Sequence, residues 1–347
     1  MKRIINTLFM VLIFAGLVLA DGKKINVVTT LSTYADIAKK IGGDRVTVTA
    51  IVKGNQDAHF VRPKPGYAVL LNKADLFVST GLDLELWAPT LVDMSKNPRI
   101  RSGQIGYVSA SYGVQLLEKP AVLSRSEGGL HIYGNPHIIT GPLNFKQIAA
   151  NIAAGLEKID PANRDYYQAN LKQFKDEVDQ RLFGPELVHL MGGELLTRLA
   201  LSGQLMDFLR NKSFGGKKLI DYLGGWLKEG MVFRGKKIVT YHKNWVYFRK
   251  MFGLEVIGYV EPKPGIPPSP KHVEELVREM RKNQVKVLLA ANYFSERKVR
   301  EICDKVGAIP VIVPMGVGGA PGTDDVFRLV DYWVSHLKDA FLRAQKS

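Results

Sequence analysis

One predicted helix near the middle of the 347-residue chain decides the fold. It reads DPANRDYYQANLKQFKDEVDQRLF, from Asp160 to Phe183. Asp160 suits an N-cap, and Pro161 suits the first helical position, where a missing N–H costs nothing. At about 1.5 Å per residue the helix spans roughly 35 Å, about the width of a small domain. Its apolar residues recur at steps of three and four and form one stripe: Tyr167, Leu171, Phe174, Val178 and Leu182.

Segments with α/β character lie on both sides of this helix. Predicted helices separate predicted strands, which is typical of mostly parallel sheets with covered faces. We therefore expect an α/β fold with two lobes, each a mostly parallel sheet with flanking helices, joined by one long rigid helix. The alternative is that the 160–183 helix is one more surface helix of a single domain. The strands are predicted at 25–30, 45–52, 76–79 and 105–108, and then at 237–241, 254–260, 285–289 and 310–313.

The length of the chain suggests two domains, and the 46% of apolar residues are enough for two buried cores. We place the N-terminal α/β lobe at 21–141 and the C-terminal α/β lobe at 184–347. Between them, 142–183 contains helices that include the linking helix. Within the second lobe, 184–235 is predicted to be a helical insertion with many glycines.

Residues 1–20 have the pattern of a cleavable secretory signal peptide. Lys2 and Arg3 form a basic start, an apolar run extends from Leu8 to Leu19, and polar residues follow Ala20. The run is short for a membrane span, although a membrane anchor is the alternative. No cysteine lies near the cleavage point, so lipid attachment there is not expected. We expect an exported protein, periplasmic where the cell has an outer membrane.

Composition argues against a nucleic-acid partner. The net charge is +15, but Lys and Arg are spread along the chain, without an arginine-rich run or a basic stripe with stacked aromatic residues. Charge alone informs about solubility and non-specific binding. The single cysteine, Cys303, excludes an intramolecular disulfide and lies in a predicted helix interior, where we expect it to be a small buried hydrophobic residue.

Three of the seven histidines share a context that the other four lack. His59 lies in a loop after a predicted strand, His137 ends a Gly/Asn/Pro loop, and His242 directly follows the strand at 237–241. Ligands bind beyond the carboxyl ends of strands in open α/β sheets, so a cleft between the lobes could bring these imidazoles together. Three imidazoles on zinc leave a fourth tetrahedral position. Each histidine could instead be a hydrogen-bonded loop residue, and no His-Glu-x-x-His motif is present.

Several segments, in this order, resemble the solute-binding proteins of zinc and manganese ABC transporters. The resemblance covers nearly the whole mature length. It implies two lobes joined by a rigid helix, with a metal ion held between them by His59, His137 and His242. The matching segments are the first-ligand loop at 54–65, the second-ligand loop GNPH at 134–137, the start of the backbone helix at 160–170, the third-ligand segment YHKNWVYF at 241–248, and the signature loop EPKPGIPPSP at 261–270.

The fourth metal ligand is where the chain departs from the family pattern. The family often has an Asp near the position of Met315 and Gly316, and no acid is present there. Asp324 and Asp325 follow at a helix start, where capping is the simpler role. Water, Asp324, Asp325 or His131 could take the fourth position, although we expect His131 to have a supporting or structural role. The remaining histidines are predicted to be surface helix residues: His189, His272 and His336.

We therefore expect a periplasmic solute-binding protein rather than an enzyme. It would capture a divalent transition metal between its lobes and, as a monomer, deliver it to an ABC transporter permease in the inner membrane. Nitrogen ligands favour Zn²⁺ over Mn²⁺, which prefers carboxylate oxygen. One alternative is a zinc-dependent hydrolase in which the same histidines hold an activated water, with Asp57 as the general base that the ligand loops supply. A surface adhesin is the other alternative.

Overall fold

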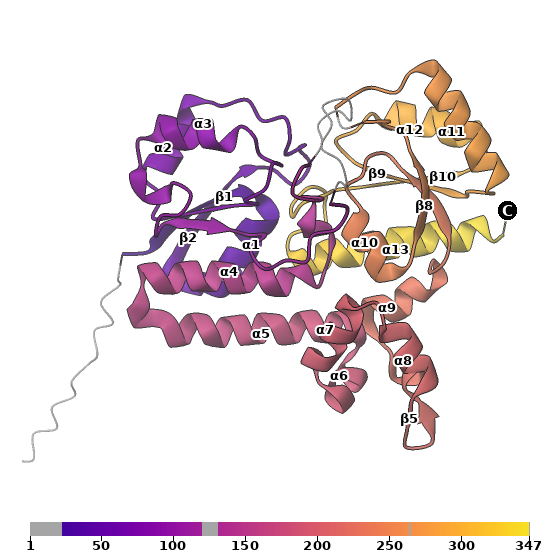
Figure 1. Cartoon of the computed structure of the whole chain (residues 1–347), viewed down its shortest axis with the longest axis horizontal. Coiled ribbons are helices and arrows are strands. Elements are labelled where there is room, and N and C mark those ends of the chain that lie inside the picture. Colours follow the sequence, from indigo (N-terminus) through magenta and orange to yellow (C-terminus); the bar gives the residue numbers. More distant parts are fainter. Residues whose placement is uncertain (1–22, 120–130, 264, 347) are drawn as a thin grey trace, which may run out of the picture.

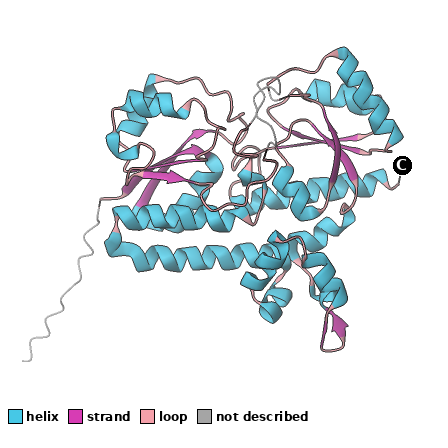
Figure 2. Cartoon of the chain, in the orientation of Figure 1, coloured by secondary structure: helices cyan, strands magenta, loops and turns pink. Residues whose placement is uncertain are grey.

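The computed structural model describes residues 23–119, 131–263 and 265–346. The predicted signal peptide at 1–20 lies outside these residues. Within the described ranges, no helix is both long and apolar enough to cross a membrane. The described chain forms two four-stranded parallel sheets, each flanked by helices (Figures 1 and 2), which confirms the expected fold class.

The first sheet has the strand order β2-β1-β3-β4, and all its strand pairs are parallel. Its strands are β1 Ile25–Leu31, β2 Val46–Val52, β3 Leu76–Ser79 and β4 Tyr107–Ser109. Parallel pairing places the loops that follow the strands at one edge of the sheet. The helices of this lobe are α1 Ser32–Gly42, α2 Pro65–Asn72, α3 Ala88–Ser95 and α4 Asn144–Ile159.

The second sheet repeats this architecture with the order β10-β9-β7-β8, again all parallel. Its strands are β7 Lys237–Thr240, β8 Glu255–Tyr259, β9 Val287–Ala291 and β10 Ile309–Val313. The central strand β9 is buried at every position, as expected for a strand covered on both faces. The flanking helices are α10 Val246–Phe252, α11 Pro270–Lys282, α12 Glu296–Asp304 and α13 Val326–Ala344.

The linking helix forms as the sequence predicts. A 3-10 turn at Pro161–Asn163 leads into α5, Arg164–Phe183, whose 20 residues span about 30 Å. Asp160 does not cap the backbone; its Oδ2 instead accepts hydrogen bonds from Asn163 Nδ2 and the Tyr167 hydroxyl, each at 2.7 Å. The predicted apolar stripe is buried at each of its five positions: Tyr167, Leu171, Phe174, Val178 and Leu182.

This helix connects the two lobes through buried contacts. On one side α5 packs against α1 and α4 (Figure 1), and further along it packs against α9, Gly225–Glu229. Lys146 of α4 and Asp179 of α5 form a buried ion pair with Nζ–Oδ2 at 2.8 Å. One cluster of buried apolar side chains includes residues of both sheets, and a smaller cluster lies between the second sheet and the helices α11 and α12. The two lobes therefore share a continuous core.

The segment at 184–235 is mostly helical, as predicted, but it also contains a small hairpin. Its longer helices are α6 Pro185–Met191, α7 Gly193–Leu201 and α8 Leu205–Asn211. The hairpin pairs β5 Ser213–Phe214 with β6 Lys217–Lys218 in antiparallel fashion and extends away from the body of the protein (Figure 1). All four of its strand residues are exposed, so no buried alternating pattern marks these strands in the sequence.

Candidate metal centre

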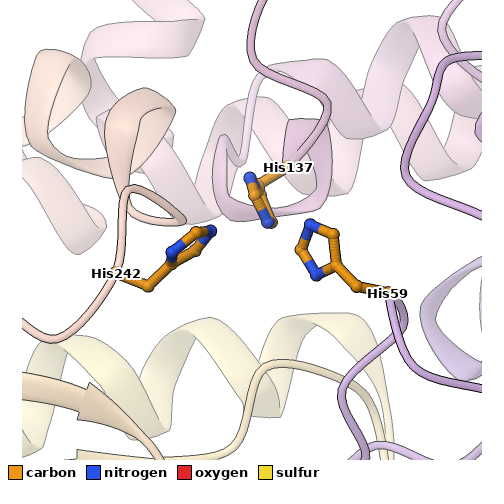
Figure 3. Close-up of side chains that lie close together, drawn as sticks. All are labelled: His59, His137 and His242. Carbon is orange, nitrogen blue, oxygen red and sulfur yellow. The ribbon is translucent and has the colours of Figure 1, made fainter. Parts of the chain in front are cut away.

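The structure brings together the three histidines that the sequence singles out. His59 lies in the loop after β2, His137 directly precedes a 3-10 turn at Ile138–Thr140, and His242 lies just after β7. Each contributes a ring nitrogen, and these nitrogens all lie within 4.8 Å of one another. His137 and His242 are buried, and His59 is half-buried. The rings converge from both lobes on one point (Figure 3), so the centre lies where the lobes meet.

Each of these rings is oriented by an oxygen atom behind it. The Nδ1–H of His59 donates to Asp57 Oδ1 at 2.7 Å, and that of His137 donates to Asn135 Oδ1 at 2.9 Å. The backbone N–H of each histidine donates to the same oxygen, at 3.0 Å and 3.1 Å, respectively. His242 Nδ1 lies 2.6 Å from Glu261 Oε2. Donation from Nδ1 leaves the lone pair on Nε2, which is the tautomer that binds a metal ion.

Two of the inward nitrogens have no hydrogen-bond partner among the described residues. His137 Nε2 and His242 Nε2 are buried and make no hydrogen bond with any described residue. Buried polar atoms are almost always paired, so two orphaned lone pairs aimed at one point need an explanation. A metal ion bound by three neutral imidazoles supplies one, and the donor set fits a borderline divalent ion such as zinc.

The surroundings of His137 and Asp57 shift their pKa values in directions that favour the binding of a cation. Burial, with a smaller contribution from the charges of His59, His242 and His131, lowers the pKa of His137 well below its usual value. His137 is therefore a neutral ligand near pH 7. Burial raises the pKa of Asp57, but the hydrogen bond from His59 and the charge of that ring outweigh it, so the net pKa of Asp57 is lowered. Asp57 thus remains an anion behind its histidine.

His131 lies beside the centre, outside the group of three histidines whose ligand atoms lie within 4.8 Å of one another. Its Nδ1 is 3.1 Å from Asp83 Oδ1, and its Nε2 is 3.3 Å from His59 Nε2. Its ring centroid is 5.4 Å from that of His59 and 5.7 Å from that of His137. A cavity of about 250 Å³ opens beside these rings, and its lining includes His59, His131, His242 and Glu261.

The two acids that were alternatives for the fourth ligand have other roles. Asp325 caps α13, because its Oδ1 accepts the backbone N–H of Phe327 at 2.8 Å and that of Arg328 at 3.0 Å. Asp324 pairs with the Arg328 guanidinium at 3.3 Å. Neither belongs to the group of described residues whose ligand atoms could share a metal ion. The predicted capping role is confirmed for Asp325.

At the position where the family often has Asp, Met315 is buried, and its sulfur accepts a hydrogen bond from Asn244 Nδ2 at 3.6 Å. The three histidines predicted to be surface residues also lie outside the group of potential ligands. His189 and His336 are exposed, and His272 Nε2 lies 3.0 Å from the Tyr259 carbonyl oxygen.

Sequence reasoning missed the outer residues Asn135, Asp83 and Glu261. One signal could have found the first: Asn135 stands two residues before His137, the same spacing that separates Asp57 from His59. Asp83 and Glu261 follow β3 and β8, at the carboxyl ends of strands. Their partners, His131 and His242, are far away in sequence, so no local spacing connects them.

Comparison with known proteins identifies the family. Residues 27–181 and 217–340 match the family model described as zinc-uptake complex component A, periplasmic. The manganese ABC transporter substrate-binding lipoprotein PsaA of Streptococcus mitis is 25% identical over 287 residues, which cover 82% of this chain and 77% of that protein. The metal ABC transporter substrate-binding lipoprotein ScbA of Streptococcus cristatus is 25% identical over 315 residues, 87% of this chain and 86% of that protein.

Solved structures show the same fold. The crystal structure of ZnuA superimposes with a TM-score of 0.65 at 21% identity and covers 92% of this chain and 99% of that one. The Mn-bound periplasmic metal-binding protein of Candidatus Liberibacter asiaticus has a TM-score of 0.63 at 18% identity, with 92% and 100% covered. The family match spans most of the chain, on both sides of α5. The chain therefore belongs to the family of zinc-uptake complex component A, extracytoplasmic metal-binding proteins that serve ABC transporters and are not enzymes.

Proposed function

We propose that this protein captures Zn²⁺ between its two lobes through His59, His137 and His242 and delivers it to an ABC transporter permease. The observation that carries the proposal is the convergence of three imidazole nitrogens. Of these, the buried Nε2 atoms of His137 and His242 have no partner in the part of the chain that the structure describes. A bound divalent ion would satisfy all three lone pairs at once. The family is one of transport components, so the zinc-hydrolase alternative is not retained.

The choice of zinc rests on the donor atoms that the site offers. Manganese prefers carboxylate oxygen, whereas imidazole suits zinc. Both Glu261 oxygens are engaged, because Oε2 faces His242 Nδ1 at 2.6 Å and Oε1 accepts the Gly265 N–H at 2.8 Å. Asp57 directs Oδ1 to the far side of the His59 ring. Several relatives are named for manganese, so the metal is the feature of this proposal that most needs a direct test.

The remaining parts of the proposal concern where the protein works. The predicted signal peptide at 1–20 would export the chain to the periplasm, where it would act as a monomer with lobes at 21–141 and 184–347, connected by the helices at 142–183. The partner would be a permease in the inner membrane. The pattern of residues 1–20 supports export, and the names of the family and its relatives support delivery to an ABC transporter.

Metal binding by the purified mature chain tests the function. Competition with a chromophoric chelator should give tight binding of one Zn²⁺ per chain and much weaker binding of Mn²⁺. His137→Ala should weaken zinc binding more than the tenfold to hundredfold change expected of an outer partner. His189→Ala is the matched control, because His189 is exposed on α6. In wild type, free zinc at a thousandfold excess over Kd should add about 4 kcal/mol of stability.

Two results would contradict the proposal. Equal zinc affinity of wild type and His137→Ala would show that the three histidines are not the ligands. Manganese binding as tight as zinc binding would show that the nitrogen donors do not decide which metal is taken.

A further inference from the structure

A fourth imidazole is presented to the metal centre in the same way as the other three. Asp83 holds the His131 ring from behind, with Oδ1 3.1 Å from Nδ1, and its Oδ2 accepts the backbone N–H of Ile132 at 3.1 Å. This carboxylate therefore fixes both the ring and the backbone beside it. The side chains of His131 and Asp83 are only 14% and 15% exposed. Such an arrangement is the one that orients histidine ligands of metal ions.

His131 and His59 contact each other through their inward ring nitrogens. Each ring has a carboxylate oxygen at its Nδ1, so each is set to carry its lone pair on Nε2. The two Nε2 atoms nevertheless lie 3.3 Å apart. Two lone pairs at that distance repel each other unless a proton or a metal ion lies between them. A metal ion bound by both nitrogens would account for this contact.

The distance between the two nitrogens suits a shared zinc ion. In a tetrahedron the separation of two ligand atoms is about 1.63 times the metal–ligand bond, so Zn–N bonds of about 2.0–2.1 Å give about 3.3–3.4 Å. The Nε2–Nε2 distance of 3.3 Å between His59 and His131 equals such an edge. One edge of the proposed site thus has the length expected for two imidazole nitrogens on one zinc ion.

The two acids that were alternatives for the fourth position have other roles. Met315 stands where the family often has a carboxylate, Asp325 caps α13, and Asp324 pairs with Arg328. We propose that His131, positioned by Asp83, is the fourth metal ligand, so that the transported ion is bound by four imidazole nitrogens and by no carboxylate. This inference rests on the proposed function and replaces the supporting role expected for His131 from the sequence.

An all-imidazole site has a consequence for the range of ions taken up. Four neutral nitrogens in a tetrahedron suit Zn²⁺ and its spectroscopic substitute Co²⁺. Mn²⁺ would exchange its water ligands for imidazole nitrogens, although it prefers oxygen ligands, so it should bind more weakly. His131, which lies outside the three-histidine set, would then be a residue that determines metal specificity.

Co²⁺ and Zn²⁺ loaded into the full mature chain test the inference. Four-coordinate Co²⁺ absorbs strongly in the visible, whereas Co²⁺ with added water ligands absorbs weakly. Wild type should give the intense spectrum, and X-ray absorption of the Zn²⁺ form should count four imidazoles. His131→Gly should lose the intense cobalt bands and bind zinc at least tenfold more weakly. Free imidazole should restore the spectrum by filling the vacated place, which a merely structural role for His131 would not allow.

Asp83→Asn should weaken zinc binding about tenfold while the imidazole count stays at four, because Asp83 positions the ring without touching the ion. His189→Gly is the control for a histidine removed elsewhere. A count of three imidazoles plus oxygen in wild type would overturn the inference and leave the proposed function intact. Failure of wild type to bind either metal would overturn the proposed function itself.

Discussion

An imidazole binds a metal ion only through a nitrogen that carries no proton, and His137 is prepared for this by its surroundings. It is fully buried, and burial is the main reason that its pKa lies well below the usual value. Burial of a neutral His137 therefore lowers the free energy of unfolding of the metal-free protein wherever this histidine is protonated in the unfolded chain. This effect should appear as a pH dependence of the stability of the metal-free protein.

We expect the metal-free protein to lose stability as pH falls below about 6.5. Between the lowered pKa of folded His137 and the usual value of 6.5, the unfolded chain binds a proton at this residue and the folded chain does not. In that window the free energy of unfolding therefore decreases as the pH decreases. The total loss is about 1.4 kcal/mol per unit of difference between the two pKa values. Above pH 6.5 this contribution is constant.

Urea denaturation of the metal-free wild type and of His137→Gln between pH 7.5 and 5 measures this contribution. The difference between the two pH profiles isolates His137 from the other titrating groups. If both proteins lost stability in parallel over this range, burial of His137 would not be the cause.

At this scale the sequence predicts part of the centre. His59, His137 and His242 were found because each lies in a loop beside a predicted strand or in a Gly/Asn/Pro turn. The role of His131 could not be read from its neighbours, because it depends on Asp83, 48 positions earlier in the chain, and on His59, 72 positions earlier. Such pairings are set by how the loops converge, and a local pattern does not encode that.

At the scale of elements, the loops that follow β2 and β10 touch backbone to backbone. The Gly316 N–H donates to the Gly54 carbonyl at 3.0 Å. A Cβ on Gly54 would collide with the carbonyl oxygens of Gly316 and Val317. Gly54 precedes His59 in the same loop, so this close approach between the lobes also sets the position of a predicted ligand.

Gly54→Ala should therefore force the two loops apart. We expect a loss of about 1–3 kcal/mol in the free energy of unfolding, the usual cost of overpacking, together with weaker zinc binding. Gly66→Ala is the matched control, because a Cβ on Gly66 in α2 would meet nothing within 4 Å. Thermal melts and chelator competition measure both effects. Equal stability and equal zinc affinity of the two alanine variants would show that the loop contact does not position the site.

The elements themselves differ in how well the sequence predicts them. The linking helix was predicted because its stripe of apolar residues has the helical period over its whole length, and the structure buries each of those residues. The hairpin of β5 and β6 was missed because its strands have two exposed residues each. Strands that short have no period to detect. The secondary structure of such short strands depends more on their contacts in the folded protein than on local propensity.

At the scale of the whole molecule, the two lobes are connected by more than a flexible hinge. The core is continuous between them, and α5 is anchored to α4 by the buried Lys146–Asp179 pair. Asp36 of α1 accepts the backbone N–H of Val326, at the start of α13, at 2.9 Å, which adds a direct contact between the lobes. Large domain closure would break these buried contacts.

Small-angle X-ray scattering should therefore change little when zinc binds. The metal-free and zinc-loaded proteins should have the same radius of gyration within error, near the roughly 20 Å expected for a compact chain of this size. His137→Ala with added zinc serves as the unbound reference. A clear contraction of wild type on loading would indicate the hinge closure of other periplasmic binding proteins and would contradict this view.

The division of the proposed ligands between the lobes has a consequence for release. His59, His131 and His137 all precede α5 in the chain, and His242 alone follows it. A slight parting of the lobes would therefore break one bond and leave the ion with the first lobe. The vacated corner of the tetrahedron would face the gap, where an incoming donor could take it. Release would then proceed by stepwise ligand exchange, and the bond between the ion and His242 would break first.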